Sequence, residues 1–221
     1  MKIKNNICKI ITRCRLCKSK KLKKVFTLNP TPIGDDYRKD KNFKSSFFDL
    51  SLNLCENCNF VQLSNVLKSE IVYGDYLYVT NTSLGLPKHF KDFVKFLEKN
   101  KYLKNNSKIL EIGCNDGTLL KEIDSKKRYV LGVDPAKDLV KNLRNNFEII
   151  VGDYNKPLSK KIDNKYGKFD LIIANNVIAN IHNLESVFNG INNNLKKNAF
   201  FVMETFSLYG LIKNNLFDNI Y

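Results

Sequence analysis

Four cysteines could hold a metal ion, because they form two Cys-x-x-Cys pairs: Cys14 with Cys17, and Cys55 with Cys58. Each pair places two thiolates on one tight turn. Two such turns facing each other make a tetrahedral all-sulfur site, for which zinc is the usual ion. A closed site of four thiolates leaves no coordination position open for catalysis. We therefore expect a structural zinc, whose binding contributes about 10–16 kcal/mol to the folding of small modules.

A second pattern, Glu111-x-Gly113-x-x-x-Gly117, lies where an expected strand gives way to a helix and indicates a nucleotide-type cofactor. Gly113 permits a sharp turn and close approach of the backbone to a ligand, and Gly117 lets the helix begin beside it. Asp134 ends the next expected strand, where a carboxylate would hold ribose hydroxyls. Pyridine-dinucleotide sites favour Gly-x-Gly-x-x-Gly, whereas here the middle glycine is absent and an acid precedes the first. This pattern resembles the first motif of class I methyltransferases that use S-adenosylmethionine.

Further polar residues could contact such a cofactor. Asn115 and Asp116 lie inside the same loop. Asp153 follows the third expected strand, where it would lie near the adenine amino group; an exposed turn aspartate is the alternative. Asn175 ends the fourth expected strand, at the edge where ligands bind in folds of this class, and a polar turn is the alternative there. Cys114 is interpreted as a small filler of the loop rather than as a ligand or nucleophile.

A parallel sheet must position these residues, and the apolar pattern after about residue 86 predicts one. Phe90, Phe93, Val94 and Leu97 recur at helical spacing, which predicts an amphipathic helix over 87–100. Short apolar strands then alternate with helices, which favours an α/β fold with a parallel sheet covered on both faces. The expected strands are 108–113, 129–134, 148–151, 169–174 and 199–205, and the expected helices are 117–125, 136–146, 184–195 and 207–215.

The two motifs divide the chain into a basic lead-in at 1–12, a zinc-binding domain at 13–80 and an S-adenosylmethionine-binding domain at 85–221. Within the zinc-binding domain, two prolines and a glycine keep 28–35 extended or turned. Strands are expected on either side of the second cysteine pair, over 47–54 and 60–63.

The 221-residue chain has a formal net charge of +15 and is 43% hydrophobic and 27% charged, which is a globular composition. The excess charge is nearly all lysine. Arginine is the residue that binds phosphates and bases in a bidentate way, so a solvated basic surface is favoured over a nucleic-acid site. No apolar run reaches the roughly 18 residues of a membrane span, and the N-terminal segment is too short and interrupted for a signal-peptide core. We expect a cytoplasmic protein without a membrane partner.

Together these segments resemble one family, the zinc-containing sugar C-methyltransferases of deoxysugar biosynthesis. The resemblance covers most of the chain and is carried by the cysteine pairs, the Glu111–Gly117 loop and these further segments: Thr31-Pro32-Ile33-Gly34-Asp35, Leu54–Leu63, Tyr76-Leu77-Tyr78-Val79-Thr80, His89-Phe90, Gly132-Val133-Asp134-Pro135 and Ala174-Asn175-Asn176-Val177. It implies a nucleotide-linked 4-keto-deoxysugar as the substrate. A base would remove the proton on the carbon next to the ketone, and the enolate would attack the sulfonium methyl.

The resemblance also implies further site residues. Tyr76 and Tyr78 match an aromatic segment that reaches into the cleft, with Tyr76 as a catalytic candidate and Tyr78 as a cofactor contact. Packing is the alternative for one of them. Tyr221 matches a catalytic-site tyrosine. The family often has His where this chain has Asn180, and it continues after Phe-Asp-x-Ile-Tyr with His-Glu-His, so the main base is expected beyond Tyr221.

The family's sheet normally has two more strands after the fifth, so we expect a sheet that is incomplete at its C-terminal edge. The chain is accordingly interpreted as a fragment, for which a second polypeptide could supply the missing C-terminal part. Two other functions stay open: a zinc-ribbon RNA methyltransferase, and a non-catalytic subunit that binds S-adenosylmethionine. The sequence does not specify the sugar, the nucleotide carrier, the methylated carbon or the oligomeric state.

Overall fold

The computed structural model describes residues 7–34, 40, 42, 44–68, 71–72, 78–123 and 127–216. The chain forms two compact units: Met1–Leu77 together with Phe206–Tyr221, and Tyr78–Thr205. This division is drawn from compactness alone, and the domain limits 13–80 and 85–221 stay a prediction. In the part of the chain that the structure describes, no helix combines the length and apolar character needed to cross a bilayer.

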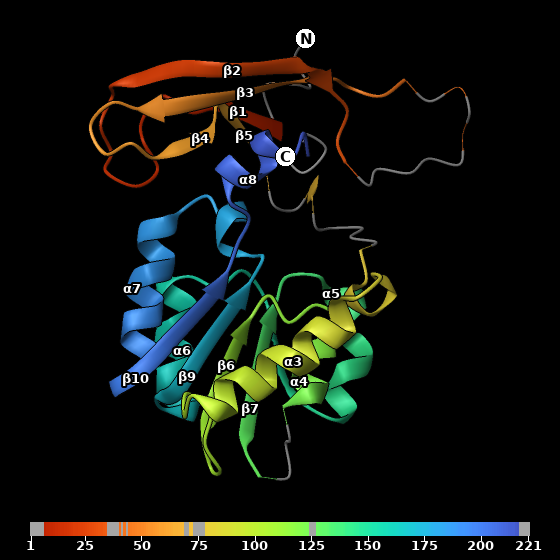
Figure 1. Ribbon diagram of the computed structural model, residues 1–221, viewed down its shortest axis with the longest axis vertical. Helices are drawn as coiled ribbons and strands as arrows, with labels where there is room; N and C mark the ends of the chain where they lie inside the picture. The colour runs from red at the N-terminus through yellow and green to blue at the C-terminus, as the bar shows by residue number, and fades with distance from the viewer. Residues whose placement is uncertain are drawn as a thin grey trace. The chain divides into compact units, whose positions relative to one another are not determined.

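The first unit is built on an antiparallel sheet of three strands in the order β2-β3-β4 (Figure 1). These strands are β2 (Leu22–Thr31), β3 (Phe48–Cys55) and β4 (Val61–Leu63), and β1 (Cys8–Ile10) pairs separately with β5 (Asn65–Leu67). The strands expected on both sides of the second cysteine pair are confirmed to within one residue. Most of β2 was missed, because its lysines hide the alternation. As an edge strand, β2 tolerates Pro30, which has no N–H to donate.

Helix α8 (Leu208–Lys213) belongs to this first unit, although it comes late in the chain. The Ser207 side chain caps the helix by accepting a hydrogen bond from the Gly210 backbone N–H. Leu211 is buried together with Leu52 of β3, and Leu208 packs against the same cluster. The apolar face of this small sheet is therefore covered in part by Leu208 and Leu211, which come much later in the chain than its strands.

The second unit contains a five-stranded sheet in the order β10-β9-β6-β7-β8, and every neighbouring pair is parallel. The strands are β6 (Lys108–Ile112), β7 (Tyr129–Asp134), β8 (Glu148–Val151), β9 (Phe169–Asn175) and β10 (Leu195–Glu204). The predicted α/β fold with a parallel sheet is confirmed. The chain moves outward from β6 to β8 and then restarts on the other side of β6 at β9. The strand order thus reverses between β6 and β9, which is where open sheets of this type bind ligands.

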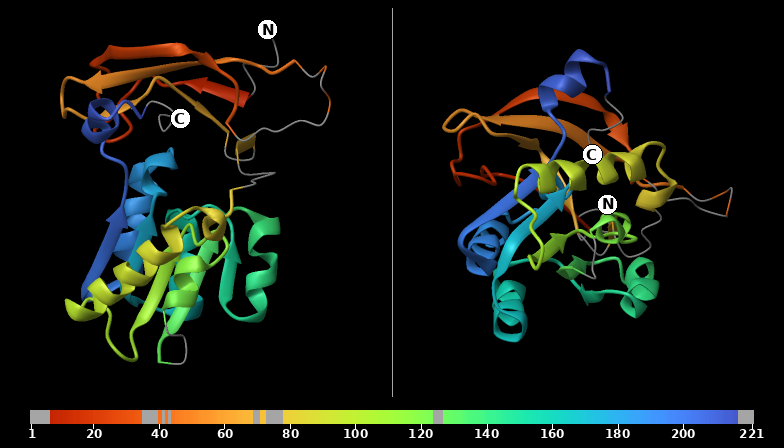
Figure 2. Two further views of the ribbon diagram at one scale, coloured as in Figure 1. Left: turned by 45° about the vertical axis from the view of Figure 1, so that its right-hand side comes forward. Right: turned by 60° about the horizontal axis from the view of Figure 1, so that its bottom comes forward.

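The helices cover both faces of this sheet. Helix α3 crosses one face, with α4 and α5 near it, whereas α6 and α7 lie against the other (Figures 1 and 2). The helices are α3 (Leu86–Lys99), α4 (Thr118–Glu122), α5 (Lys137–Val140), α6 (Lys156–Tyr166) and α7 (Leu184–Asn194). The helix expected over 136–146 is wrong as a single element, because α5 gives way to a 3₁₀ helix at Lys141–Asn145.

Helix α6 was not predicted, because its buried stripe is narrow. Within α6 only Ser159 and Ile162 are buried, and lysines fill much of the remainder. Helix α3, on the opposite face of the sheet, has a wide apolar stripe. Its Phe90, Val94 and Leu97 are buried together with side chains of β6 and β9. That stripe was correctly recognised from its spacing.

Candidate functional site

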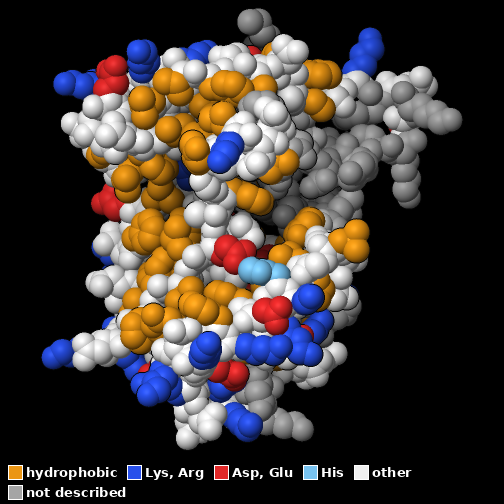
Figure 3. All heavy atoms as spheres, in the orientation of Figure 1, with side chains coloured by type: hydrophobic (Ala, Val, Ile, Leu, Met, Phe, Trp, Pro, Cys, Tyr) orange, Lys and Arg blue, Asp and Glu red, His pale blue; other side chains and the backbone are white. Residues whose placement is uncertain are grey.

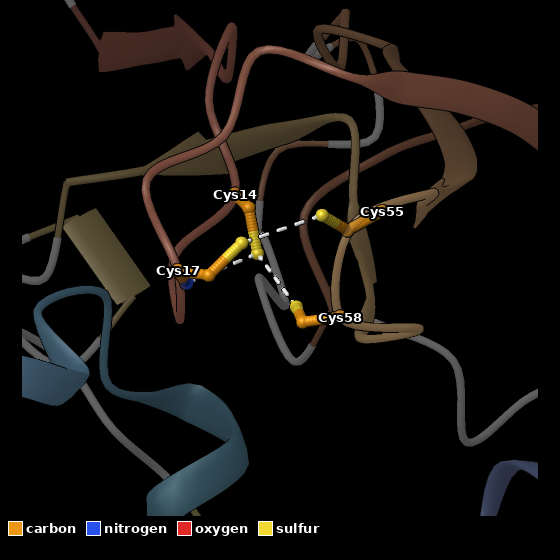
Figure 4. A group of neighbouring side chains, drawn as sticks. All are labelled: Cys14, Cys17, Cys55 and Cys58. Carbon is orange, nitrogen blue, oxygen red and sulfur yellow. Dashed lines mark hydrogen bonds between the residues drawn. The ribbon is translucent and has the colours of Figure 1, made fainter.

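The four predicted metal ligands lie together in the first unit (Figure 4). The Sγ atoms of Cys14, Cys17, Cys55 and Cys58 all lie within 4.8 Å of one another. The Cys14–Cys58 and Cys17–Cys55 sulfur distances are 3.7 Å and 3.5 Å. Four sulfurs held about 2.3 Å from one zinc ion would be separated by roughly 3.8 Å. The cluster therefore has the size and the donor set that tetrahedral zinc requires.

Both cysteine pairs lie in turns of the same form. The Lys18 N–H donates to the Cys14 carbonyl at 3.0 Å, and the Asn59 N–H donates to the Cys55 carbonyl at 2.8 Å. Lys18 and Asn59 each follow the second cysteine of a pair and have left-handed backbones, with φ of 64° and 60°. Each turn thus curls its two thiols toward the opposite turn.

Without a metal ion, the cluster favours thiolate at Cys17 and thiol at Cys58. A hydrogen bond from the Ser19 backbone lowers the pKa of Cys17 to about 6, and the Asn57 amide also approaches its sulfur, at 3.5 Å. A backbone hydrogen bond from Phe60 favours the Cys58 thiolate, but burial and hydrogen bonds with the neighbouring cysteines outweigh it and raise the pKa of Cys58 to about 12. Cys8 lies in β1 and is not a member of the cluster. The arrangement therefore agrees with a structural four-thiolate site closed to substrate.

In the second unit, the loop between β6 and α4 makes a tight turn at the carboxyl edge of the sheet. Gly113 and Gly117 have left-handed φ values of 75° and 71°. A Cβ at Gly113 would lie 2.2 Å from Val177 Cγ2, and one at Gly117 would lie 2.8 Å from a Leu143 methyl. Both glycines are thus required by backbone conformation and by packing. The space beside each is filled by this chain's own side chains, where sequence reasoning had placed a ligand.

The side chains of Asn115 and Asp116 hold the preceding segment against this loop. Asn115 Oδ1 accepts hydrogen bonds from the N–H and hydroxyl of Thr80 at 2.9 Å and 3.0 Å, and its amide donates to the Tyr78 carbonyl at 3.1 Å. Asp116 Oδ2 accepts from the Asn81 N–H at 3.1 Å, while Oδ1 accepts from Thr118 at the start of α4. Both residues were predicted to bind cofactor, and in the structure their polar groups join two backbone segments.

Tyr78, another predicted cofactor contact, is partly exposed, and its hydroxyl lies 2.8 Å from Ser83 Oγ. The two catalytic candidates Tyr76 and Tyr221 lie outside the described residues. Asn180 and His182 are exposed beyond the end of β9, in and just after a short 3₁₀ turn.

Asp134 ends β7 as predicted and is buried at the carboxyl edge of the sheet. Its Oδ2 accepts from the Asn115 N–H and its Oδ1 from the Ala136 N–H, both at 2.8 Å. Burial raises the pKa of Asp134, the two backbone hydrogen bonds oppose that shift, and the nearby charge of Asp153 adds to it. The carboxylate thus fixes the loop between β6 and α4, and its oxygens keep lone pairs that can accept hydrogen bonds from hydroxyl groups.

Glu111 and Asn175 are the polar side chains at this edge whose hydrogen-bonding groups are left over. Among the described residues, Glu111 Oε2 and both polar side-chain atoms of Asn175 are buried and have no hydrogen-bond partner. Glu111 pairs with Ile173 in the β6–β9 register, so Asn175 lies two positions further along on the same face. This is the face covered by α3, because Ile109 and Leu171 point into the same cluster as Phe90. Buried polar groups normally have partners, so these atoms are candidates to bind a ligand.

Glu204, at the end of β10, was missed as a candidate by sequence reasoning. Its Oε2 lies 2.7 Å from His89 Nε2 of α3, and its Oε1 lies 3.5 Å from the Asn176 amide nitrogen. All three groups lie at the carboxyl edge of the sheet, where a substrate would meet a bound cofactor. The signal was available, because the rule that selects Asp134 at the end of its strand also selects Glu204.

The groups at this edge fit S-adenosylmethionine. Asp134 can accept hydrogen bonds from ribose hydroxyls, and the Glu111 carboxyl can face the positive charge of the ligand. The Asn175 amide can both donate hydrogen bonds to the amino-acid part and accept them from it. The polar atoms without partners, rather than the glycines, are the groups of this edge that are available to such a ligand.

Comparison with protein families gives two matches. A model described as "Putative zinc binding domain" matches residues 14–73, and a model described as "Methyltransferase domain" matches residues 85–220. The second match covers more than half of the chain.

Individual proteins are also similar. The chain is 26% identical over 220 residues to the C-methyltransferase NovU of Streptomyces niveus, covering 98% of this chain and 52% of that protein. It is 31% identical over 134 residues to the uncharacterized methyltransferase C70.08c of Schizosaccharomyces pombe, covering 58% of this chain and 48% of that one. The crystal structure of PH0226 from Pyrococcus horikoshii OT3 is 25% identical with a TM-score of 0.47, covering 62% of each chain. The chain thus spans about half the length of the curated relatives it matches.

Proposed function

The chain belongs to the methyltransferase domain family, with S-adenosylmethionine as its methyl donor and a zinc-binding domain before it, and from this premise we propose that it takes part in C-methylation of a nucleotide-linked 4-keto-deoxysugar. The similarity to NovU, a C-methyltransferase, over almost the whole chain is the observation that carries the proposal. Transfer to carbon requires an acidified C–H bond. A ketone next to that carbon makes its proton removable, which is why a keto-sugar suits this chemistry.

When bound, the cofactor supplies an electrophilic methyl group. This chain's residues would hold it: Asp134 would accept hydrogen bonds from the ribose hydroxyls, Glu111 would face the sulfonium, and Asn175 would meet the amino-acid part. At the neighbouring strand end, Glu204 and His89 form a 2.7 Å pair. We propose this pair as a contact for the sugar, because it lies at the edge where a substrate would approach the methyl group.

Several parts of the proposal rest on the family resemblance. In it, Tyr76 and Tyr221 belong to the substrate site, and the main base lies after Tyr221. The proposed contact of Asp153 with the adenine rests instead on its place after β8. The zinc site folds its own unit and takes no part in the transfer.

The test is methyl transfer from S-adenosylmethionine to a thymidine diphosphate 4-keto-6-deoxysugar, followed by mass spectrometry of the sugar and by solvent deuterium exchange next to the ketone. The assay uses the zinc-loaded chain alone and with the C-terminal half of a NovU-like protein. We expect a mass gain of one methyl group on carbon in at least one of the two mixtures. Cofactor binding without methylation or exchange in either mixture would refute the sugar assignment and favour a non-catalytic role.

The alternative function, methylation of RNA, can be tested separately through the salt dependence of RNA binding. Lys88, Lys91, Lys95 and Lys99 are exposed along α3, and Lys and Arg side chains are numerous on the lower part of the face shown in Figure 3. A chain that acts on RNA would bind it with an affinity that falls steeply with salt. We expect weak binding to a structured RNA at 150 mM salt, because helix α3 also carries acids such as Asp92 and Glu98 among these lysines.

A further inference from the structure

The carboxyl edge of the second unit's sheet collects acids around one buried carboxyl group. Glu111 is only 4% exposed, and its Oε2 has no hydrogen-bond partner among the described residues. The charged groups that act on this carboxyl are Asp134 of β7 and Asp116 of the loop, and both are acids. Asp153, which follows β8, acts on Asp134 in turn.

Within the described ranges, the remaining elements around Glu111 offer it no counter-charge. The β9 partner in register is Ile173, and Asn175 beyond it is neutral. On α3, His89 is held by Glu204 at 2.7 Å. The thiol of Cys114 lies in the same loop, and burial raises its pKa well above the usual value, so that it stays a neutral thiol.

A buried carboxylate without a cation is expensive, and the usual resolution is that the group takes up a proton. Burial first, and then the charges of Asp134 and Asp116, raise the pKa of Glu111 well above its ordinary value. Burial and the neighbouring acids therefore favour the neutral, protonated form of this carboxyl in the cofactor-free protein.

S-adenosylmethionine carries one more positive charge than its demethylated product, because only the donor has a sulfonium. We propose that Glu111 is protonated in the cofactor-free site and releases its proton to solvent when S-adenosylmethionine binds, so that this residue makes the site prefer the charged donor over the neutral-sulfur product. The O–H bond of the carboxyl group breaks, the proton passes to buffer, and the carboxylate that remains balances the ligand's extra charge. The inference rests on S-adenosylmethionine as the cofactor and is independent of which sugar is methylated.

The sign of the pH effect follows from this exchange. Below the pKa of Glu111 in the free site, one proton must leave for each donor bound, so the affinity for S-adenosylmethionine rises close to tenfold per pH unit. Above that pKa the affinity becomes constant. The affinity for S-adenosylhomocysteine changes much less over the same range, and the preference for donor over product therefore grows with pH.

The experiment is isothermal titration calorimetry of the zinc-loaded chain in two buffers of different ionisation enthalpy, from pH 6 to 8.5, with S-adenosylmethionine and S-adenosylhomocysteine as ligands. The heat difference between buffers counts the protons released. We expect close to one proton for the donor at the low end of the range and clearly fewer for the product.

Two variants identify the group that releases the proton. Glu111→Gln keeps the shape of the neutral carboxyl group and cannot ionise, so it should release no proton, lose the pH dependence and bind donor and product with similar affinity. Glu122→Gln, a matched acid on α4, should behave as the unmodified chain. Circular dichroism checks that both are folded.

Three results would overturn the inference: donor binding without proton release, proton release that persists in Glu111→Gln, or equal release with both ligands. Heat of binding without proton release would leave the cofactor assignment intact. The absence of binding by either ligand would overturn both.

Discussion

Replacing Gly113 by Ala tests whether the cofactor loop is held closed by the chain's own packing. The new methyl group would lie 2.2 Å from Val177 Cγ2 and 3.2 Å from its Cβ. Valine is branched at Cβ and stiff at χ1, so it cannot simply rotate its methyl groups away. The backbone of Gly113 is also left-handed, at φ 75°.

The two effects can be sized separately. A left-handed backbone costs a residue with a Cβ roughly 1–2 kcal/mol. Overpacking a filled site costs typically about 1–3 kcal/mol. We therefore expect Gly113→Ala to lower the free energy of unfolding by about 2–5 kcal/mol, which is a large part of the 5–15 kcal/mol, roughly, that domains possess.

A matched glycine isolates the packing contribution. Gly85, before α3, has φ of 84° and nothing within 4 Å of the position its Cβ would take, so Gly85→Ala should cost only the backbone strain, about 1–2 kcal/mol. Urea unfolding of the zinc-loaded chain, followed by the helical circular dichroism signal, reports the second unit because α3 to α7 lie there. The double variant Gly113→Ala/Val177→Ala, in which the side chain beside residue 113 is also shortened, should recover part of the lost stability. Equal destabilisation by the two single variants would show that Val177 does not fill the space beside Gly113.

Three further predictions concern the metal, pH and the strand-end pair. Cys55→Ser, at a position with no exposed surface, should remove tight zinc binding and unfold the three-stranded sheet, measured by zinc titration and amide hydrogen exchange, while the second unit keeps its helical signal. Without ligand, the raised pKa of Glu111 makes the protonated form the stable one. Stability should therefore fall as pH rises from the unfolded value of about 4.3 to the folded pKa, and Glu111→Gln should flatten that fall in urea unfolding. Glu204→Gln should cost less than about 1 kcal/mol of stability, because the His89 pair is partly exposed, yet reduce the affinity for the nucleotide-sugar measured by calorimetry; unchanged sugar affinity would remove the pair from the proposed substrate site.

The sequence was informative wherever one strong physical constraint acts on a short segment. The central parallel strands β6, β7 and β9 were recognisable because strands buried on both faces are almost continuously apolar, as in the run from Leu171 to Ala174. The cysteine pairs were recognisable because four thiols can meet around one ion in very few ways. Weaker constraints were missed: α6 buries little apolar surface, and β2 lies at a sheet edge where lysines are tolerated.

The residues of the cofactor loop show a limit of a different kind. Position and residue type correctly placed Asn115 and Asp116 at the edge of the sheet, but could not show what their polar atoms bind. In the structure these atoms are taken by Thr80, Tyr78 and Asn81. Such pairings join segments separated by 35 residues, and no local pattern encodes them.

What separates a binding group from a structural one at this edge is whether its hydrogen bonds are already made. Asn115 and Asp116 have theirs, Asp134 has some of them, and Glu111 Oε2 and the Asn175 amide have none within the part of the chain that the structure describes. Leaving buried polar atoms without partners costs about 1–3 kcal/mol each, and a fold can carry that cost when a ligand removes it. Ligand binding should therefore stabilise most the positions whose polar atoms lack partners, and we expect Glu111 and Asn175 to respond to a ligand more strongly than the two glycines.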